Sequence, residues 1–267
     1  MNNGNEIWSA GDAYEEYVGR WSRRVAEQFL DWLEAPAGWS WLDVGCGTGA
    51  LSRAIAIRTR PANVLGIDTS EGFLEHARNQ VQDRCATFQR GDAQEIPSGD
   101  GQFDAAVSGL VLNFVPTKGR MIAEMRRVVR PGGTVALYVW DYAGEMQLMR
   151  RFWDAAAALD PVARELDEGV RFAMCAPGPL AELFQNAGLA AVETRAIDVS
   201  TVFSDFDDFW SPFLGGQGPA PGYCVSLTEE QRTRLRDHLR QTLPAQADGR
   251  IALIARAWAV RGMVPAT

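Results

Sequence analysis

The sequence is poor in the residues that build metal centres and disulfide frameworks. It has two histidines and four cysteines in 267 residues. The cysteines are far apart, with no C-x-x-C pair and no histidine at ligand spacing: Cys46, Cys85, Cys175 and Cys224. Structural zinc sites and disulfide scaffolds both need such spacing. We therefore expect free thiols and no metal site.

A surplus of basic residues and a long apolar run are also missing. The formal net charge is −8, and an acidic surface repels the phosphate backbone and anionic lipid headgroups. The longest uncharged apolar stretch, residues 105–115, is about half of what a bilayer-spanning helix needs. The first residues, MNNGNEIWSAGDAYEE, lack the basic start and apolar run of a signal peptide. We expect a cytoplasmic protein with neither a nucleic-acid nor a membrane partner.

Short apolar runs alternate with helical patterns along the first half of the chain. A helix is expected after Ser70, which can cap its first turn, and another over residues 117–129, before Pro131. Strands that alternate with single helices form right-handed parallel βαβ units. Two later alternating stretches, residues 192–203 and 250–260, are expected to close the sheet edge as an antiparallel pair. The earlier strands are expected at residues 41–44, 63–67, 103–107 and 134–140.

The most informative segment is WLDVGCGTGALS, residues 41–52. A predicted strand runs into Gly45, Gly47 and Gly49, and a helix then begins. Such a loop lets the backbone approach a ligand closely and directs free helical N–H groups at it. The same spacing, with Ala50, also satisfies the looser dinucleotide-binding pattern, so an NAD-dependent oxidoreductase is an alternative at this point.

Acidic residues follow three consecutive predicted strands. Asp43 lies two residues before the first glycine and suits a cationic ligand such as an α-amino group or a sulfonium. Asp68 could accept hydrogen bonds from both ribose hydroxyls. Asp92 could accept from an exocyclic adenine amine while the amide of Ala93 donates to the ring. Each aspartate could instead cap a turn, but three at one sheet edge favour a shared ligand.

Four segments in this order resemble the class I S-adenosylmethionine-dependent methyltransferases, in particular the small-molecule type that is similar to quinone-biosynthesis C-methyltransferases. They are LDVGCGTG, GIDTSEGFLEHAR, GDAQEIP followed by FDAAVSGLVLNFV, and VVRPGGTVALYVW, within residues 38–140. The resemblance implies a doubly wound, mostly parallel seven-stranded α/β sheet with an antiparallel last strand and a helical cap. It also implies S-adenosylmethionine as cofactor and S-adenosylhomocysteine as product.

The resemblance assigns a set of residues to the cofactor. Ser108 and Leu110 would run past its methionine part. The N-terminal helix, residues 14–33, often covers the cofactor in this family, so Tyr17 and Arg20 are candidates, Arg20 for the ligand's carboxylate. That helix could instead simply pack on the sheet with a solvated arginine. The remaining cofactor residues are Asp43, Gly45, Gly47, Asp68, Thr69, Asp92 and Ala93.

The whole chain, residues 1–267, is interpreted as a single methyltransferase domain. We expect an N-terminal helical cover at 11–35, a cofactor-binding core at 38–140 and substrate-cap segments at 141–190 and 205–245. The aromatic residues of 206–214 could be core or the roof of a substrate pocket. Pro212 should start a turn or kink the helix there.

The expected reaction is methyl transfer to an unidentified small molecule by in-line displacement, for which positioning in a dry pocket can supply most of the rate. A base is needed only when the nucleophile must lose a proton. The candidates near the crevice are Tyr14, Asn113, Asp141 and Tyr142. Many relatives have a histidine near the position of Asn113. This chain reads LVLNFV there and has no histidine, so it cannot use the role of that histidine.

Two other functions stay open from the sequence. A catalytically inactive S-adenosylmethionine-binding or interaction protein could share this fold, because the chemistry requires no invariant nucleophile. The NAD-dependent oxidoreductase depends only on the glycine spacing, and Asp43 argues against it. A metal-assisted O-methyltransferase would need clustered ligands, which the sequence lacks. A homodimer is also left open.

Overall fold

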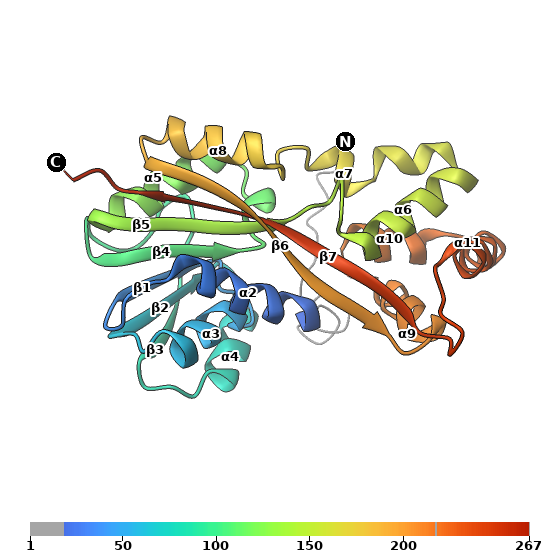
Figure 1. The fold of residues 1–267 in the computed structure, drawn as a ribbon, viewed down its shortest axis with the longest axis horizontal. Helices are drawn as coiled ribbons and strands as arrows, with labels where there is room; N and C mark the ends of the chain where they lie inside the picture. The colour runs from blue at the N-terminus through green and yellow to red at the C-terminus, as the bar shows by residue number, and fades with distance from the viewer. Residues whose placement is uncertain (1–18, 217, 267) are drawn as a thin grey trace. The chain divides into compact units, whose positions relative to one another are not determined.

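The computed structural model describes residues 19–216 and 218–266. In this part of the chain seven strands form one sheet in the order β3-β2-β1-β4-β5-β7-β6 (Figure 1). Neighbouring strands among β1 to β5 are parallel, and β7 is antiparallel to β5. The predicted fold class is confirmed. The strands are β1 (Ser40–Val44), β2 (Asn63–Asp68), β3 (Ala86–Arg90), β4 (Phe103–Gly109), β5 (Val129–Trp140), β6 (Ala190–Phe203) and β7 (Ile251–Met263).

The helices begin where the sequence supplies caps or prolines. Ser70 accepts a hydrogen bond from the Phe73 amide at 3.4 Å and so caps α4, as predicted. The helices are α2 (Arg20–Leu33), α3 (Ala50–Arg58), α4 (Glu71–Gln80), α5 (Lys118–Val128), α6 (Gln147–Leu159), α7 (Glu168–Arg171), α8 (Pro177–Asn186), α9 (Phe206–Trp210), α10 (Pro219–Ser226) and α11 (Glu229–Thr242). Short 3-10 helices are η2 (Leu112–Phe114), η3 (Pro161–Glu165) and η4 (Ser211–Gly215).

The chain divides into two compact units. The first, the sheet unit, comprises Ser22–Trp140, Met174–Ile197 and Ala257–Thr267. Within it α3 and α4 pack on β2 and β3, and α5 packs on β4, β5 and α8. The central strands β1 and β4 are buried along most of their length, as expected for parallel strands covered on both faces.

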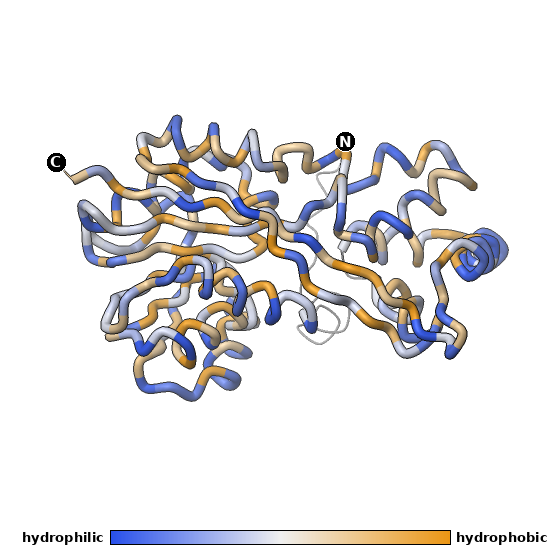
Figure 2. The backbone as a smooth tube through the Cα atoms, viewed as in Figure 1, coloured by the Kyte–Doolittle hydropathy of each residue, from blue (hydrophilic) through white to orange (hydrophobic). Residues whose placement is uncertain are grey.

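The second unit, the helical unit, comprises Asp141–Ala173, Asp198–Arg256 and the described part of Met1–Trp21. Its core is aromatic: the rings of Phe152 and Phe213 are stacked with centroids 4.4 Å apart, and Phe209 is fully buried beside Phe213. Helix α11 of this unit is mostly hydrophilic (Figure 2). The chain changes from α9 to a 3-10 helix at Ser211, one residue before the proline that predicted a turn or kink.

The segment after α5 differs from the prediction. We expected the strand to begin at residue 134 after a Pro-Gly-Gly turn, whereas β5 begins at Val129 and includes those glycines. The pairing with β4 is irregular there, with a register shift between Phe103 and Ala105. Gly132 has a φ of 77°, so the glycines form a distortion inside the strand.

Asp104 ties three strands together at the amino-terminal edge of the sheet. Its carboxylate accepts hydrogen bonds from the Ser40 amide at 2.7 Å and from Arg130 Nε at 2.5 Å. Burial pushes the pKa of Asp104 upward, but these two donors outweigh burial and the pKa lies below its ordinary value. The carboxylate is therefore well satisfied in its ionised form.

Two expected absences concern partners and metals. No helix within residues 19–216 and 218–266 is long and apolar enough to cross a bilayer. Over the same residues no group of three acidic, histidine or cysteine side chains is arranged to hold a metal ion.

Candidate functional site

The loop between β1 and α3 bends through the left-handed region at each of its three glycines. The φ angles are 71° at Gly45, 51° at Gly47 and 88° at Gly49. The amides of Gly45 and Cys46 both donate to the carbonyl of Ile67, at 2.8 and 2.9 Å. The loop is thereby fixed against the end of β2, and α3 begins at once with Gly49 as its N-cap. Side chains other than hydrogen are strained in this conformation.

Two of these glycines differ in what surrounds them, which gives a testable pair. A Cβ on Gly45 would lie 2.7 Å from both γ-methyl carbons of Val111, whereas a Cβ on Gly47 would meet nothing within 4 Å. We expect Gly45→Ala to lower the free energy of unfolding by about 1–3 kcal/mol more than Gly47→Ala, since only the former adds overlap to backbone strain. Urea denaturation measures both. Equal losses would contradict the packing role of Gly45.

Asp43 is the most unusual carboxylate of the site. It lies one residue before the end of β1 and is fully buried. One oxygen, Oδ2, accepts the hydroxyl of Ser52 at 2.7 Å, while Oδ1 is buried with no hydrogen-bond partner among residues 19–216 and 218–266. Burial raises the pKa of Asp43 to about 7. A cation bound beside the glycine loop would compensate the ionised form, so this residue fits a positively charged ligand.

Asp68 fastens the glycine loop to the start of α4. It is the last residue of β2, its Oδ2 accepts the Gly47 amide at 3.0 Å, and its Oδ1 accepts the Ser70 amide at 2.9 Å. A carboxylate oxygen can accept more than one hydrogen bond, so capacity for two hydroxyl groups is left. Thr69, which lies between Asp68 and Ser70 in the chain, is exposed. The hydrogen-bonding capacity of Asp68 is therefore sufficient for the predicted ribose contact in addition to this anchoring role.

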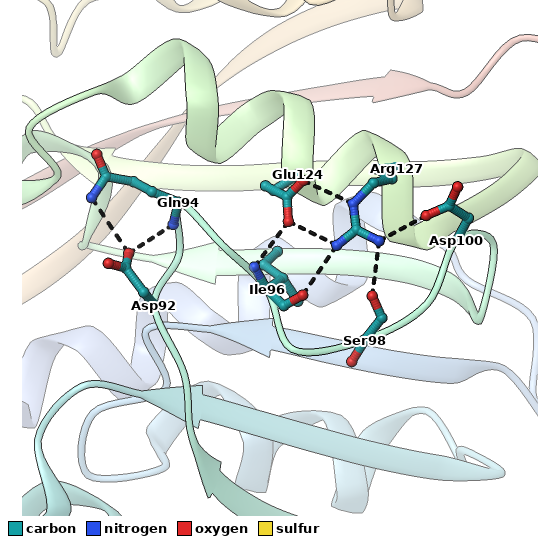
Figure 3. Close-up of polar contacts among 7 residues, drawn as sticks. All are labelled: Asp92, Gln94, Ile96, Ser98, Asp100, Glu124 and Arg127. Atoms are coloured by element: carbon teal, nitrogen blue, oxygen red, sulfur yellow. Dashed lines mark hydrogen bonds and ion pairs between the residues drawn. The ribbon is translucent and has the colours of Figure 1, made fainter.

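Asp92 follows the end of β3, on the same edge of the sheet. It is exposed, and its Oδ1 accepts the backbone amide of Gln94 at 2.8 Å and the side-chain amide of Gln94 at 3.4 Å (Figure 3). Gly91 donates to the carbonyl of Asp68 at 3.0 Å, so the ends of β2 and β3 are joined. Ala93 is half-buried. The structure thus brings Asp43, Asp68 and Asp92 to consecutive strand ends, as the sequence predicts.

Ser108 and Leu110, the two candidates at the end of β4, have structural partners. The buried hydroxyl of Ser108 donates to the carbonyl of Val44 at 2.7 Å, which ties β4 to β1. The Leu110 amide donates to the carbonyl of Tyr138 at 2.8 Å, and Leu110 has a φ of 64°. A leucine held in this region costs about 1 kcal/mol or more. Their predicted contacts with the methionine part of the cofactor stay predictions.

Arg20, the remaining cofactor candidate, lies in the helical unit. Its Nη1 donates to Oδ1 of Asp208 at 2.9 Å, and its guanidinium lies 4.4 Å from the Trp21 ring centroid and 4.9 Å from that of Phe203. A ligand carboxylate would have to compete with Asp208 for this arginine. Tyr14 and Tyr17 lie outside the described residues.

The other base candidates have structural surroundings. The Asp141 oxygens accept the amides of Gly144 at 3.1 Å and Glu145 at 2.9 Å, which closes the turn after β5. Tyr142 is buried with its ring centroid 5.2 Å from that of Phe172. Asn113 is buried in η2. All three described candidates are buried, so none of them is exposed as a base.

Sequence reasoning missed three residues that hold the loop after β3: Gln94, Glu124 and Arg127 (Figure 3). The only signal in the sequence was the spacing of Glu124 and Arg127, an acidic residue three positions before an arginine, shortly ahead of the Pro-Gly-Gly segment. Such pairs are common on helix surfaces, so the spacing alone did not reveal their target.

The family profile described as "Methyltransferase domain" matches residues 42–137. This range spans the glycine loop and all three strand-end carboxylates. Residues 42–137 are therefore a methyltransferase domain of this family. The family match supports the expected cofactor, S-adenosylmethionine. S-adenosylhomocysteine as the product stays a prediction.

Known relatives and structures agree with this assignment. This methyltransferase is similar to the 2-methyl-6-phytyl-1,4-hydroquinone methyltransferase of Synechocystis sp., 31% identical over 187 residues, which cover 68% of this chain and 57% of the relative. It is also similar to the malonyl-[acyl-carrier protein] O-methyltransferase of Pectobacterium atrosepticum, 30% identical over 169 residues, which cover 63% and 64%. The chain spans about half the length of the curated relatives it matches.

Among solved structures, the fold is similar to that of phosphoethanolamine N-methyltransferase 2 of Haemonchus contortus in complex with S-adenosyl-L-methionine. The TM-score is 0.59 at 17% identity, and the match covers 95% of this chain and 56% of the other. At this identity the likeness establishes the fold alone. These comparisons give no support to an inactive binding protein or to an NAD-dependent oxidoreductase.

Proposed function

We propose that this protein transfers a methyl group from S-adenosylmethionine to a small molecule. The observation that carries the proposal is the set of three carboxylates at consecutive strand ends around a glycine turn, with a half-satisfied, fully buried carboxylate at Asp43. Negative charge at this point suits the ammonium and sulfonium groups of the cofactor and opposes the pyrophosphate of a dinucleotide.

Each of these residues has a separate task in the proposed site. Asp43 stabilises the positive charge of the ligand from beneath the loop, and Gly47 leaves the loop surface free of side-chain atoms. Asp68 accepts the ribose hydroxyls, and Asp92 with Ala93 recognises the adenine edge. When bound, S-adenosylmethionine supplies a methyl carbon that is open to in-line attack by a nucleophile.

The methyl acceptor is proposed to be nucleophilic before it binds. Asp141 already accepts two backbone amides, and Tyr142 and Asn113 are buried in packed surroundings. Without an exposed base among the three described candidates, an amine, a carboxylate or an enolate is favoured over a neutral phenol. A screen of acceptor classes tests this, and phenol methylation that rises sharply at basic pH would contradict it.

Binding of the cofactor is the first experiment. The purified chain is titrated calorimetrically with S-adenosylmethionine, S-adenosylhomocysteine and NAD under identical conditions. Micromolar binding of the two sulfur ligands and none of NAD supports the proposal. Binding of NAD alone would overturn it, together with the interpretation of Asp43. Cytoplasmic location and a homodimer are further predictions, checked by fractionation and by sedimentation.

A further inference from the structure

Two side chains of α5 bind the backbone of the loop that follows β3 (Figure 3). Glu124 Oε2 accepts the Ile96 amide at 2.9 Å, and Arg127 Nη2 donates to the Ile96 carbonyl at 3.0 Å. Arg127 Nη1 also donates to the Ser98 carbonyl and to Oδ1 of Asp100, both at 2.8 Å. Both polar groups of Ile96 are therefore satisfied by one helix, as a neighbouring strand would satisfy them.

Glu124 and Arg127 are also bound to each other, by two hydrogen bonds of 2.8 and 2.7 Å. This contact, with the opposing effect of burial, lowers the pKa of Glu124, so the pair stays ionised at neutral pH. Their side chains are 19% and 32% exposed, and the pair is bidentate and joined to Asp100, a geometry in which an ion pair can contribute to stability. The same two side chains also fix the backbone of the loop at Ile96 and Ser98.

A second attachment connects the loop to the start of the same helix. The side-chain carbonyl of Gln94 accepts the amide of Thr117, the N-cap of α5, at 3.0 Å. The backbone and side-chain amides of the same glutamine donate to Oδ1 of Asp92. Asp92 is thus linked through one residue to a helix whose inner face, with Met121 and Met125, is fully buried.

We propose that Gln94, Glu124 and Arg127 are positioning residues that fix Asp92 and Ala93 for recognition of the 6-amino group of adenine. The inference rests on the proposed function, since it specifies how that site selects its nucleoside. A hydrogen bond to one exocyclic amine discriminates only when its acceptor is held within about 0.5 Å. An exposed loop without these attachments would not hold Asp92 to that tolerance.

The experiment compares S-adenosylhomocysteine with S-inosylhomocysteine, in which oxygen replaces the 6-amino group. Calorimetry gives the dissociation constants of both for the full chain and for Arg127→Met. We expect the variant to bind S-adenosylhomocysteine about tenfold more weakly and S-inosylhomocysteine less than about twofold more weakly. Arg126→Met, on the exposed adjacent position of α5, is the matched control and should keep both constants.

The dissociation constant of S-inosylhomocysteine divided by that of S-adenosylhomocysteine separates positioning from mere stability. A loosened fold weakens the binding of both ligands alike and leaves this ratio unchanged. A variant with a lower melting temperature but the wild-type ratio would overturn the proposal. Gln94→Leu provides an independent test, since it removes the link to Asp92 and leaves the Glu124–Arg127 pair intact. It should reduce the ratio, as Arg127→Met does. An unchanged ratio would overturn the proposal. Failure of the unmodified protein to bind S-adenosylhomocysteine would instead refute the proposed function.

Discussion

Replacing Asp68 with alanine is expected to raise the dissociation constant of S-adenosylhomocysteine about a hundredfold, the loss of roughly 2.7 kcal/mol. The effect has two sources. The variant loses the acceptor for the ribose hydroxyls, and it releases the amides of Gly47 and Ser70, which the carboxylate holds at 3.0 and 2.9 Å. Calorimetric titration of the folded variant measures the change.

Two comparisons sharpen the Asp68 experiment. Asp83→Ala removes an exposed aspartate that also accepts a backbone amide, that of Cys85, but lies after α4 and away from the strand ends. It should leave the affinity unchanged. The 2′,3′-dideoxy analogue of S-adenosylhomocysteine, which lacks both ribose hydroxyls, should bind the unmodified protein weakly. Its contact with the Asp68 carboxylate is lost, so Asp68 should contribute nothing to its affinity through the ribose. If Asp68→Ala binds S-adenosylhomocysteine within about twofold of wild type, the ribose assignment is wrong.

The affinity for S-adenosylhomocysteine should also fall at acidic pH because of Asp43. Burial raises the pKa of this carboxyl to about 7 in the ligand-free protein. A ligand that requires the ionised form must remove a proton below that pH, at a cost of about tenfold in affinity per pH unit. From pH 7 to pH 5 the dissociation constant should rise roughly fiftyfold, because the carboxyl is already half protonated at pH 7. Calorimetry in two buffers of different ionisation enthalpy would detect the released proton.

The same pKa shift determines how stability responds to pH. The folded-state pKa of Asp43 lies above the unfolded value of 3.8. The stabilisation that the protonated carboxyl gives the folded protein is therefore complete below pH 3.8 and is lost as the pH rises through about 7. The ligand-free protein should therefore lose stability from this group between pH 4 and 8, and the bound ligand should restore it. Asp43→Asn is the control and should show a flat affinity profile. A flat profile in the unmodified protein would contradict the role of Asp43.

The sheet and the strand-end carboxylates could be predicted because their signals are local. Asp43 and Asp68 lie at the ends of short apolar runs, whereas Asp92 follows the mostly polar segment ATFQRG. Parallel strands bring their carboxyl ends to one edge. The glycines needed no tertiary information either, since their φ values follow from the turn itself. These parts of the site are encoded within a few consecutive residues.

The hydrogen-bond partners could not be predicted, because they join distant parts of the chain. Arg20 meets Asp208 across 188 positions, and Arg127 meets the Ile96 carbonyl across 31. Asp141 was attractive as a base from its place at a strand end, but its oxygens close a turn. The start of β5 was predicted too late because Pro131 and two glycines obscure a strand that bends instead of stopping.

Asp104 and Asp43 separate a part of the sheet that supports stability from the part that we propose binds the ligand. They lie on neighbouring strands at opposite edges of the sheet, and the pKa of Asp104 is lowered by its donors while that of Asp43 is raised by burial. Folding therefore gains from ionised Asp104 and is opposed by ionised Asp43, as the trade-off between stability and activity describes. Ser40, Asp104 and Arg130 should therefore be kept unchanged when the protein is engineered for heat resistance or for ligand affinity.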